Sequence, residues 1–260
     1  MPRGNRYIVG APSCHITHRC HNREFLLKFA KDRDQYRRRL CDALSASRVA
    51  LLDYTITSNH VHLLVNAEDE NRIPVLMQQV AGEFARDYNR RKNRSGAFWE
   101  SRYHATQVDS GSYLWRCLLY IELNMVRCGK VHHPEEWDWC GFSELTGSKQ
   151  RNRLLNLQTL LELLGLDSRE ELKARLQDGM AERVRKDQLK RESLWTESIA
   201  VGSESFIDTM ATKVRHRQRL VRDAYEGCCL IREEHAPLFG TKNSSIAPNS
   251  THELDLSDWQ

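Results

Sequence analysis

The stretch VALLDYTITSNHVHLLV at residues 49–65 decides the fold. Its two β-rich runs, residues 49–56 and 60–65, are joined by three polar residues, a connection short enough for an antiparallel hairpin. Side chains alternate along a strand, so His60 and His62 project from the same face. The stretch therefore predicts two paired strands with two imidazoles on one surface.

Further elements flank this hairpin and define the fold class. Hydrophobic periodicity predicts strands and helices in the order β-α-β-β-α-β-α. This order predicts an α+β fold, a ferredoxin-like antiparallel sheet with helices packed on it. The elements outside the hairpin are a strand at residues 14–20, a helix at 32–47, a helix at 71–93, a strand or hairpin at 98–108 and a helix at 110–127 that stops at Gly129.

The remainder of the chain has a different pattern. Helical periodicity at residues 154–166, 168–180 and about 203–225 predicts an all-α C-terminal extension over residues 151–240. Ser, Asn and Pro dominate beyond it, which predicts a disordered tail at residues 241–260. We therefore expect a first domain at residues 1–150, followed by the extension and the tail.

Composition excludes several classes of protein. The 260 residues are 40% hydrophobic and 28% charged. No apolar run approaches the ~18 residues that a membrane span needs, and no signal peptide begins the chain. The eight cysteines include no Cys-x-x-Cys pair, which favours reduced thiols over a zinc ribbon or a redox centre. We expect a cytoplasmic protein with no membrane partner.

Charge is divided unevenly along the chain. Residues 1–150 hold 22 Lys and Arg against 17 Asp and Glu, a net +5, whereas the rest holds 17 against 18, a net −1. The positive excess hints at a polyanionic partner for the first part.

The two histidines could form half of a metal site, because imidazole is a common ligand. The alternative is a sheet surface with two ordinary histidines. No acidic residue follows them closely, which excludes a His-x-His-x-Asp-His loop. Alternation along the strand at residues 14–20 separates His15 from Cys14, and we interpret this strand as lining the site rather than holding zinc.

The helix at residues 110–127 could supply the other half of a site. At about 100° per residue, its apolar residues fall on one stripe, and Tyr120 and Asn124 fall on another with Arg127. Tyr120 and Asn124 are four residues apart and therefore neighbours on the helix surface. The alternative is that Tyr120 is a partly buried aromatic with its hydroxyl bonded to Asn124 or to solvent.

These motifs together resemble the single-tyrosine HUH transposases, and most of all the REP-associated tyrosine transposases related to IS200-like enzymes. The resemblance covers roughly residues 5–147. It is carried by Ser-Asn-His-Val-His-Leu-Leu-Val at residues 58–65, Tyr-Ile-Glu-Leu-Asn-Met-Val-Arg-Cys-Gly at 120–129 and Trp-Asp-Trp at 137–139. The basic residues 88–91 and the Phe-Trp-Glu-Ser-Arg-Tyr segment at 98–103 also match the style of that family.

The resemblance implies a function and a set of site residues. His60, His62 and Asn124 are expected to bind a divalent cation, Mg²⁺ or Mn²⁺, and Tyr120 is expected to attack the scissile phosphate of single-stranded or hairpin DNA. The implied product is a 5′-phosphotyrosine with a free 3′-hydroxyl. The chain departs from the family at Met125, where proline is usual, and we expect a straighter helix end there.

Basic side chains near the site are expected to contact the DNA backbone, with Phe98, Trp99 or Tyr103 stacking on unpaired bases. The alternative is a solvated helix face on which these cations are interleaved with carboxylates. The predicted DNA-binding residues are Arg86, Arg90, Arg91, Lys92, Arg94, Arg102 and Arg127; the first helix, with Arg33 and Arg37–Arg39, is a weaker candidate.

Two rival functions stay open at this stage. One is a catalytically silent protein on the same fold that binds hairpin DNA or RNA. The other is an adaptor in which the helices at residues 150–225 dominate. The sequence also leaves open whether the protein is a monomer or a homodimer, and whether Tyr120 acts on the site of its own chain.

Overall fold

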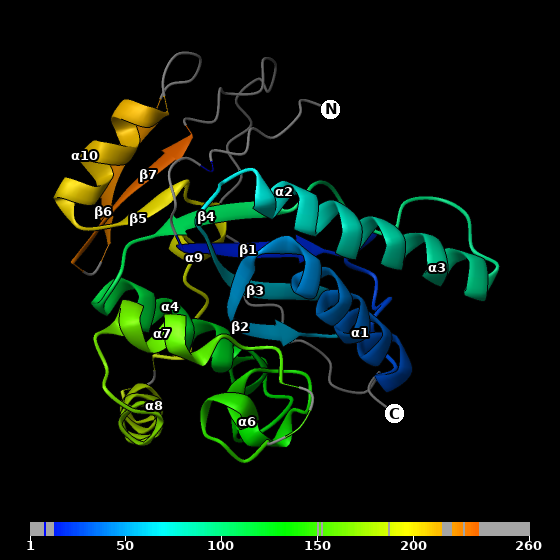
Figure 1. Cartoon of the computed structure of the whole chain (residues 1–260), viewed down its shortest axis with the longest axis horizontal. Coiled ribbons are helices and arrows are strands. Elements are labelled where there is room, and N and C mark those ends of the chain that lie inside the picture. The colour runs from blue at the N-terminus through cyan, green and yellow to red at the C-terminus, as the bar shows by residue number, and fades with distance from the viewer. Residues whose placement is uncertain are drawn as a thin grey trace, which may run out of the picture.

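The computed structural model describes residues 8, 13–149, 151, 153–186, 188–214, 220–225 and 227–233. A sheet with the strand order β2-β3-β1-β4-β5-β7-β6 runs through the molecule (Figure 1). Its strands are β1 (Ser13–Arg19), β2 (Val49–Ile56), β3 (His60–Ala67), β4 (His104–Val108), β5 (Ala200–Gly202), β6 (Leu220–Tyr225) and β7 (Cys228–Glu233).

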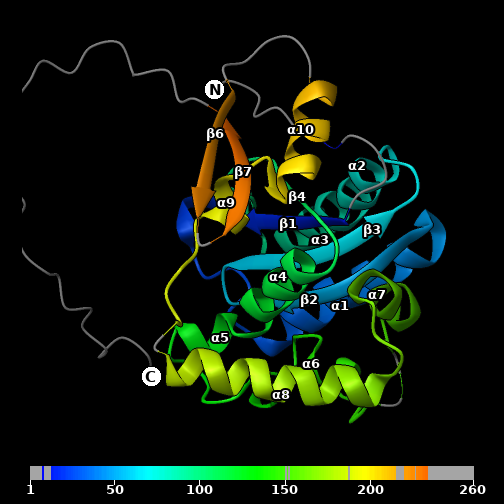
Figure 2. The same ribbon diagram turned by 90° about the vertical axis from the view of Figure 1, so that its left-hand side faces the viewer.

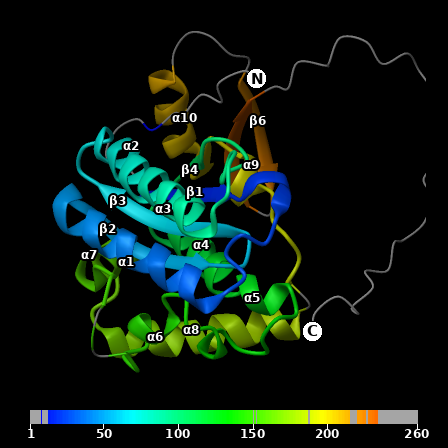
Figure 3. The same cartoon turned by 90° about the vertical axis from the view of Figure 1, so that its right-hand side faces the viewer.

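Helices cover both faces of the sheet. One layer consists of α1 (Ala30–Ser47), α2 (Arg72–Met77), the π-helical turn η2 (Gln78–Gly82) and α3 (Glu83–Lys92), and Figure 3 shows it from its own side. The opposite layer holds α4 (Ser112–Glu122), α5 (Asn124–Arg127), α7 (Leu157–Leu164) and α9 (Leu194–Glu197). The long helix α8 (Arg169–Arg185) runs beneath this second layer (Figure 2). The remaining elements are the 3-10 turns η1 (His21–Arg23) and η3 (Pro134–Glu136), α6 (Phe142–Leu145) and α10 (Glu204–Lys213).

The first four strands form the core of the sheet in the order β2-β3-β1-β4, and every pair among them is antiparallel. Along the chain these strands and their helices follow the β-α-β-β-α-β order of ferredoxin-like folds. The predicted α+β class is therefore confirmed. The complete sheet is mixed rather than antiparallel, because β5 pairs with β4 in parallel.

Alternation along β3 explains why the histidines face one layer. Val61, Leu63 and Val65 belong to the apolar core beneath α1 and α3, whereas Leu64 packs in the core against α4. His60 and His62 share the parity of Leu64 and lie on the α4 side. Burying a side chain such as Leu63 stabilises the fold by about 1.5–3 kcal/mol, so a one-residue slip that exchanged the two faces is strongly disfavoured.

The predicted all-α extension is wrong. Its first two helices are confirmed as α7 and α8, but the third predicted helix at residues 203–225 ends at Lys213, and residues 220–225 form β6. β6 pairs with β7, which pairs with β5, so the C-terminal strands prolong the same sheet. Local periodicity did not reveal that β7 would pair with β5, because those two strands are separated by α10 in the chain. The predicted tail at residues 241–260 lies outside the described residues.

Two local predictions also need correction. The helix expected at residues 110–127 is not straight: α4 ends at Glu122, and Leu123, with φ −78° and ψ 5°, separates it from α5. Met125 in place of proline therefore does not give one continuous helix. The strand expected at residues 98–108 is confined to β4, and the segment before it is irregular. Within the described part of the chain, no helix is long and apolar enough to cross a membrane.

Candidate active site

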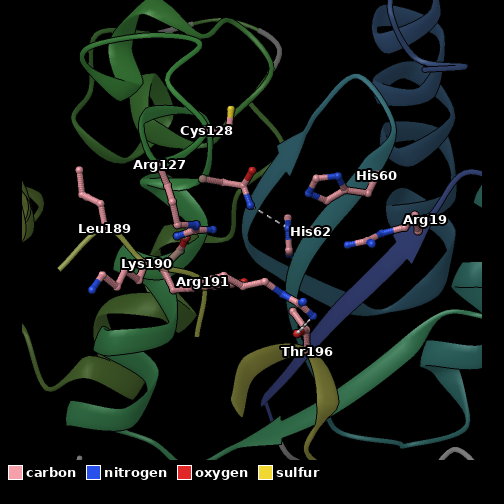
Figure 4. A pocket seen from close by; sticks show the side chains of 11 residues that line it. Arg19, His60, His62, Arg127, Cys128, Leu189, Lys190, Arg191 and Thr196 are labelled. Carbon is pink, nitrogen blue, oxygen red and sulfur yellow. Dashed lines mark hydrogen bonds between the residues drawn. The ribbon is translucent and has the colours of Figure 1, made fainter. Parts of the chain in front are cut away.

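A pocket of about 520 Å³ brings the predicted metal ligands and the predicted nucleophile together (Figure 4). The start of β3 and the end of β1 form one wall, α4 and α5 form a second, and residues 189–196 form a third. The lining residues are Arg19, His60, His62, Tyr120, Asn124, Arg127, Cys128, Leu189, Lys190, Arg191 and Thr196.

His60 begins β3 and is held by the turn before it. Its Nδ1 lies 2.7 Å from Oδ1 of Asn59 and 2.9 Å from Oγ1 of Thr57. The amide nitrogen of Asn59 donates to the carbonyl of Arg23, so Oδ1 is the amide atom that accepts from His60. His60 therefore carries its proton on Nδ1, and Nε2 is left with a lone pair and no hydrogen-bond partner among the described residues. Burial lowers the pKa of His60 to about 3, with Arg19 and Arg127 adding to the effect.

His62 is more deeply buried and has partners on both ring nitrogens. Nε2 lies 2.9 Å from the amide nitrogen of Asn124, and Nδ1 lies 2.9 Å from Nε2 of His15. The rings of His60 and His62 are 4.9 Å apart between centroids. Burial lowers the pKa of His62 well below its ordinary value, and the neighbouring His60 and His15 act in the same direction. The ring is therefore neutral at pH 7.

Tyr120 lies on the last turn of α4 with its ring 2% exposed. The ring centroid is 6.0 Å from those of His62 and His15. The guanidinium carbon of Arg127 lies 4.2 Å from the centroid, which is a cation–π contact. Burial raises the pKa of the Tyr120 phenol above 10.0, and the charge of Arg127 opposes that rise.

The pocket is positively charged. Arg19, Arg127, Lys190 and Arg191 line it, and the described lining residues include no carboxylate. Arg191 is also held by Glu197 at 2.8 Å, outside the lining. Cations that converge with no anion between them make a site for a phosphate group.

Sequence comparison identifies the family of the part of the chain that holds most of the pocket. The family model described as "Transposase IS200 like" matches residues 9–124. Residues 9–124 are an IS200-like transposase domain. The resemblance identified from the motifs is thus confirmed, and all four predicted catalytic and metal-binding positions lie within the matched residues. Arg127 and residues 189–196 lie beyond them. No curated protein matches the chain.

Two solved structures are similar to the chain that carries this IS200-like domain. One is a REP-associated tyrosine transposase bound to a REP hairpin; the similarity covers 60% of this chain and 93% of that one, with 14% identity and a TM-score of 0.46. The other is a candidate transposase from Deinococcus radiodurans R1, with 50% and 98% covered, 17% identity and a TM-score of 0.34.

Most of the predicted DNA-binding residues lie away from the pocket of the IS200-like domain. Only Arg127 lines it. At the end of α3, Arg91 pairs with Asp32, Arg90 lies 2.8 Å from Asp87, and Arg94 lies 3.7 Å from Glu24. Arg86, Lys92 and Arg102 are exposed. The role of this group in DNA binding stays a prediction.

The aromatic residues expected to stack on DNA bases have other roles. Phe98 and Tyr103 are 2% and 6% exposed and belong to the core of the IS200-like domain. Trp99 stacks on His18 with 4.0 Å between ring centroids, and its indole nitrogen donates to the carbonyl of Ala81. The prediction of a base-stacking role for these side chains is wrong for Phe98 and Tyr103, because a buried ring offers no face to a base.

Several residues in or behind the pocket were given no role from the sequence. His15, which the sequence placed on a strand lining the site, is fully buried behind the pocket and bonds to His62, a contact that nothing in the sequence showed. Arg19 lies opposite His60 in the β1–β3 register. Lys190, Arg191 and Thr196 arrive from beyond the IS200-like domain. They carry no periodic signal, because their position depends on where the chain returns to pair with β4.

The donor set fits a divalent cation. In the described part of the chain, no three His, Cys, Asp or Glu side chains group together, so a cation here needs an amide oxygen as its third protein ligand. Asn124 offers one beside His62. The amide nitrogen of Asn124 donates to Nε2 of His62 at 2.9 Å, so the amide oxygen of the same group is close to that imidazole. Two imidazoles and an amide suit Mn²⁺ or other transition ions at least as well as Mg²⁺.

Proposed function

We propose that the protein is a metal-dependent single-stranded DNA endonuclease and strand transferase of the HUH type, a transposase that acts through a covalent link to Tyr120. The observation that carries the proposal is the meeting of Tyr120, His60, His62 and Asn124 in one pocket of one chain. We assign the activity to a domain of residues 1–150, and residues 151–240 to an extension that adds to the pocket wall. The nucleophile then acts on the site of its own chain.

The reaction begins with Tyr120. Its phenolic oxygen bonds to the scissile phosphorus, the bond from phosphorus to the 3′ oxygen breaks, the phenol loses its proton, and the 3′ oxygen leaves as a hydroxyl. The downstream strand stays attached as a 5′-phosphotyrosine. One phosphoester bond replaces another, so the 3′-hydroxyl of a second strand can reverse the step and join the strands without a nucleotide cofactor.

Arg127 is proposed to prepare the nucleophile. A buried phenol resists ionisation, and the pKa of Tyr120 is accordingly raised. The guanidinium over the ring favours the phenolate electrostatically and lowers the cost of ionisation. Arg127 also donates to the carbonyl of Tyr120 at 3.3 Å, which fixes the guanidinium over the end of α4.

His60, His62 and Asn124 are proposed to hold Mg²⁺ or Mn²⁺. When bound, the ion would supply Lewis-acid stabilisation of charge on a phosphate oxygen. The chain's own contribution is to aim both imidazole lone pairs into the pocket. The hydrogen bond that Nδ1–H of His60 donates to Oδ1 of Asn59 does this for His60, and the contact with His15 does it for His62.

The substrate is proposed to be single-stranded DNA next to a hairpin, the substrate that resemblance to REP-associated transposases implies. Arg19, Lys190 and Arg191 supply charge for the backbone on either side of the scissile phosphate. The absence of a carboxylate among the described lining residues keeps this wall attractive to phosphate.

The test is incubation of a labelled single-stranded hairpin with the full chain and Mn²⁺ or Mg²⁺, followed by denaturing electrophoresis. We expect a covalent protein–DNA adduct with the wild type and none with Tyr120→Phe. Tyr113→Phe is the matched control, because Tyr113 lies on the same helix but does not line the pocket, and it should form the adduct normally.

Two outcomes would contradict the proposal. An undiminished yield of adduct with Tyr120→Phe would show that Tyr120 is not the nucleophile. Tight, salt-sensitive hairpin binding with no adduct under either metal would show that the protein binds hairpin DNA without cleaving it.

A further inference from the structure

A chain of three hydrogen-bonding groups runs from the C-terminal part of the molecule to the proposed metal ligand His62. The carbonyl oxygen of Trp195 lies 2.8 Å from Nδ1 of His15. Nε2 of His15 lies 2.9 Å from Nδ1 of His62. His15 and His62 are 0% and 3% exposed, and their rings are nearly parallel, at 11°. Both side chains are therefore almost fully shielded from solvent.

The chemistry of each group fixes where the protons lie. A carbonyl oxygen only accepts, so His15 must carry a proton on Nδ1. A fully buried imidazole with no carboxylate bonded to it is neutral, so Nε2 of His15 has a lone pair and accepts. Nδ1 of His62 must then be the donor. Because His62 is neutral as well, its Nε2 carries no proton and presents a lone pair toward Asn124 and the pocket.

We propose that His15 is a positioning residue that holds His62 in the Nδ1–H tautomer, with the backbone carbonyl of Trp195 as its anchor. Only this tautomer leaves Nε2 of His62 able to bind a cation from the pocket. Neutral histidine in water favours the opposite tautomer, with the proton on Nε2, so the protein has to impose the required one. Outer partners of this kind orient metal-binding histidines and set which nitrogen is free.

The anchor lies outside the IS200-like domain and is itself firmly held. Oγ1 of Thr106 lies 3.1 Å from the same carbonyl and 2.7 Å from the carbonyl of Ser198, and its single proton is shared between the two. The indole nitrogen of Trp195 donates to Glu192 at 3.0 Å, and Glu192 pairs with Arg183 on α8. Residues 192–195 are thus fixed from both sides. This segment therefore sets which ring nitrogen of His62 carries the proton, although it contacts His62 only through His15.

This inference rests on the proposed function, because it takes His62 as a metal ligand. Its first test needs no metal and no variant beyond one used for assignment. Long-range ¹H–¹⁵N correlation spectra of the ¹⁵N-histidine-labelled full chain at pH 7 distinguish a protonated ring nitrogen from a bare one. The signals of His62 are identified by their loss in His62→Gln. We expect Nδ1 protonated and Nε2 bare; the reverse would overturn the inference.

The second test measures Mn²⁺ affinity by titration calorimetry on folded variants, with circular dichroism as the check of folding. His15→Phe removes the relay and should weaken Mn²⁺ binding by about 10- to 100-fold. His15→Gln restores one donor and one acceptor and should recover most of the affinity. His104→Phe is the matched control, because His104 donates to the carbonyl of Ser198 in the same segment but does not bond to His62. It should bind Mn²⁺ like the wild type.

The outcomes separate this inference from the function beneath it. If His62→Gln binds Mn²⁺ as tightly as the wild type, the proposed metal site is wrong. If His62→Gln loses the ion but folded His15→Phe keeps it, only the relay is wrong. If His15→Phe fails to fold, two measurements still test the role of His15. They are the tautomer of His62 in the wild type and the Mn²⁺ affinity of His15→Gln.

Discussion

Two regions of the chain build the pocket, and they do so in different ways. The IS200-like domain supplies the proposed nucleophile and the proposed metal ligands from regular elements: His60 and His62 on β3 and Tyr120 on α4. The segment at residues 189–196 supplies Lys190 and Arg191 from irregular backbone, together with the carbonyl that anchors His15. The reacting groups thus come from one region, and part of the charge and support around them comes from the other.

The half of the site within the IS200-like domain is supported by contacts from the segment at residues 189–196. Glu192 is 7% exposed and links Trp195 to Arg183, while Trp195 packs near the ring of Tyr120 with 6.3 Å between centroids. We therefore expect changes next to Tyr120 and the proposed metal ligands to reduce the chemistry, and changes in the segment or away from the pocket to weaken DNA binding alone. Four substitutions, ordered by expected effect, test that division.

His62→Ala should have the largest effect. Adduct formation should fall by more than about 100-fold, because changes to the partners of a ligand already cost 10- to 100-fold. The initial rate of adduct formation at saturating Mn²⁺ measures it. His133→Ala, which alters an exposed histidine outside the pocket, is the control. Activity in His62→Ala that matches the control would show that the domain does not carry the metal site.

Arg127→Ala should have the next largest effect and should depend on pH. Arg127 opposes the raised pKa of Tyr120, so its removal raises that pKa further and lowers the phenolate fraction at every pH below it. For a shift of about one pKa unit, the rate at neutral pH falls about tenfold, and the rise of rate with pH moves to higher pH. The pH–rate profile of adduct formation measures both. Arg127→Lys keeps the charge, so its pH–rate profile should lie between those of the wild type and Arg127→Ala. If the profile of Arg127→Ala matches that of the wild type, the proposed role of the guanidinium is wrong.

The double substitution Lys190→Ala, Arg191→Ala should weaken DNA binding without removing the covalent chemistry. Two lost phosphate contacts should reduce the slope of log affinity against log salt by about 1.4, at about 0.7 per contact with single-stranded DNA. Fluorescence anisotropy over a salt series measures the slope. Lys186→Ala, an exposed lysine paired with Glu182 in the same region, is the control. An unchanged slope would show that Lys190 and Arg191 do not contact the DNA backbone.

Lys92→Ala should have the smallest effect. Lys92 lies at the end of α3, outside the pocket, 5.1 Å from the ring centroid of the exposed Phe29. If the predicted contact with the hairpin backbone exists, the salt slope falls by about 0.9 and the rate at saturating DNA does not change. A lower rate at saturation would place α3 closer to the chemistry than the structure does.

The parts of the site that could be predicted are those set by local periodicity. A period of two put His60 and His62 on one face, and a spacing of four put Asn124 beside Tyr120. The break at Leu123 could not be predicted, because the residues around it favour a continuous helix. Lys190 and Arg191 could not be placed, since their position follows from the pairing of β5 with β4. Residues 220–225 were also predicted as helix, whereas in the structure they form β6 and pair with β7.

The most direct test of the central claim is peptide mapping of the covalent adduct. Cleavage after Arg116 and Arg127 releases residues 117–127, whose single tyrosine is Tyr120. After reaction of the wild type with hairpin DNA and Mn²⁺, mass spectrometry should find this peptide joined to a nucleotide through a 5′-phosphate. A nucleotide on any other peptide, or no nucleotide at all, would contradict the account.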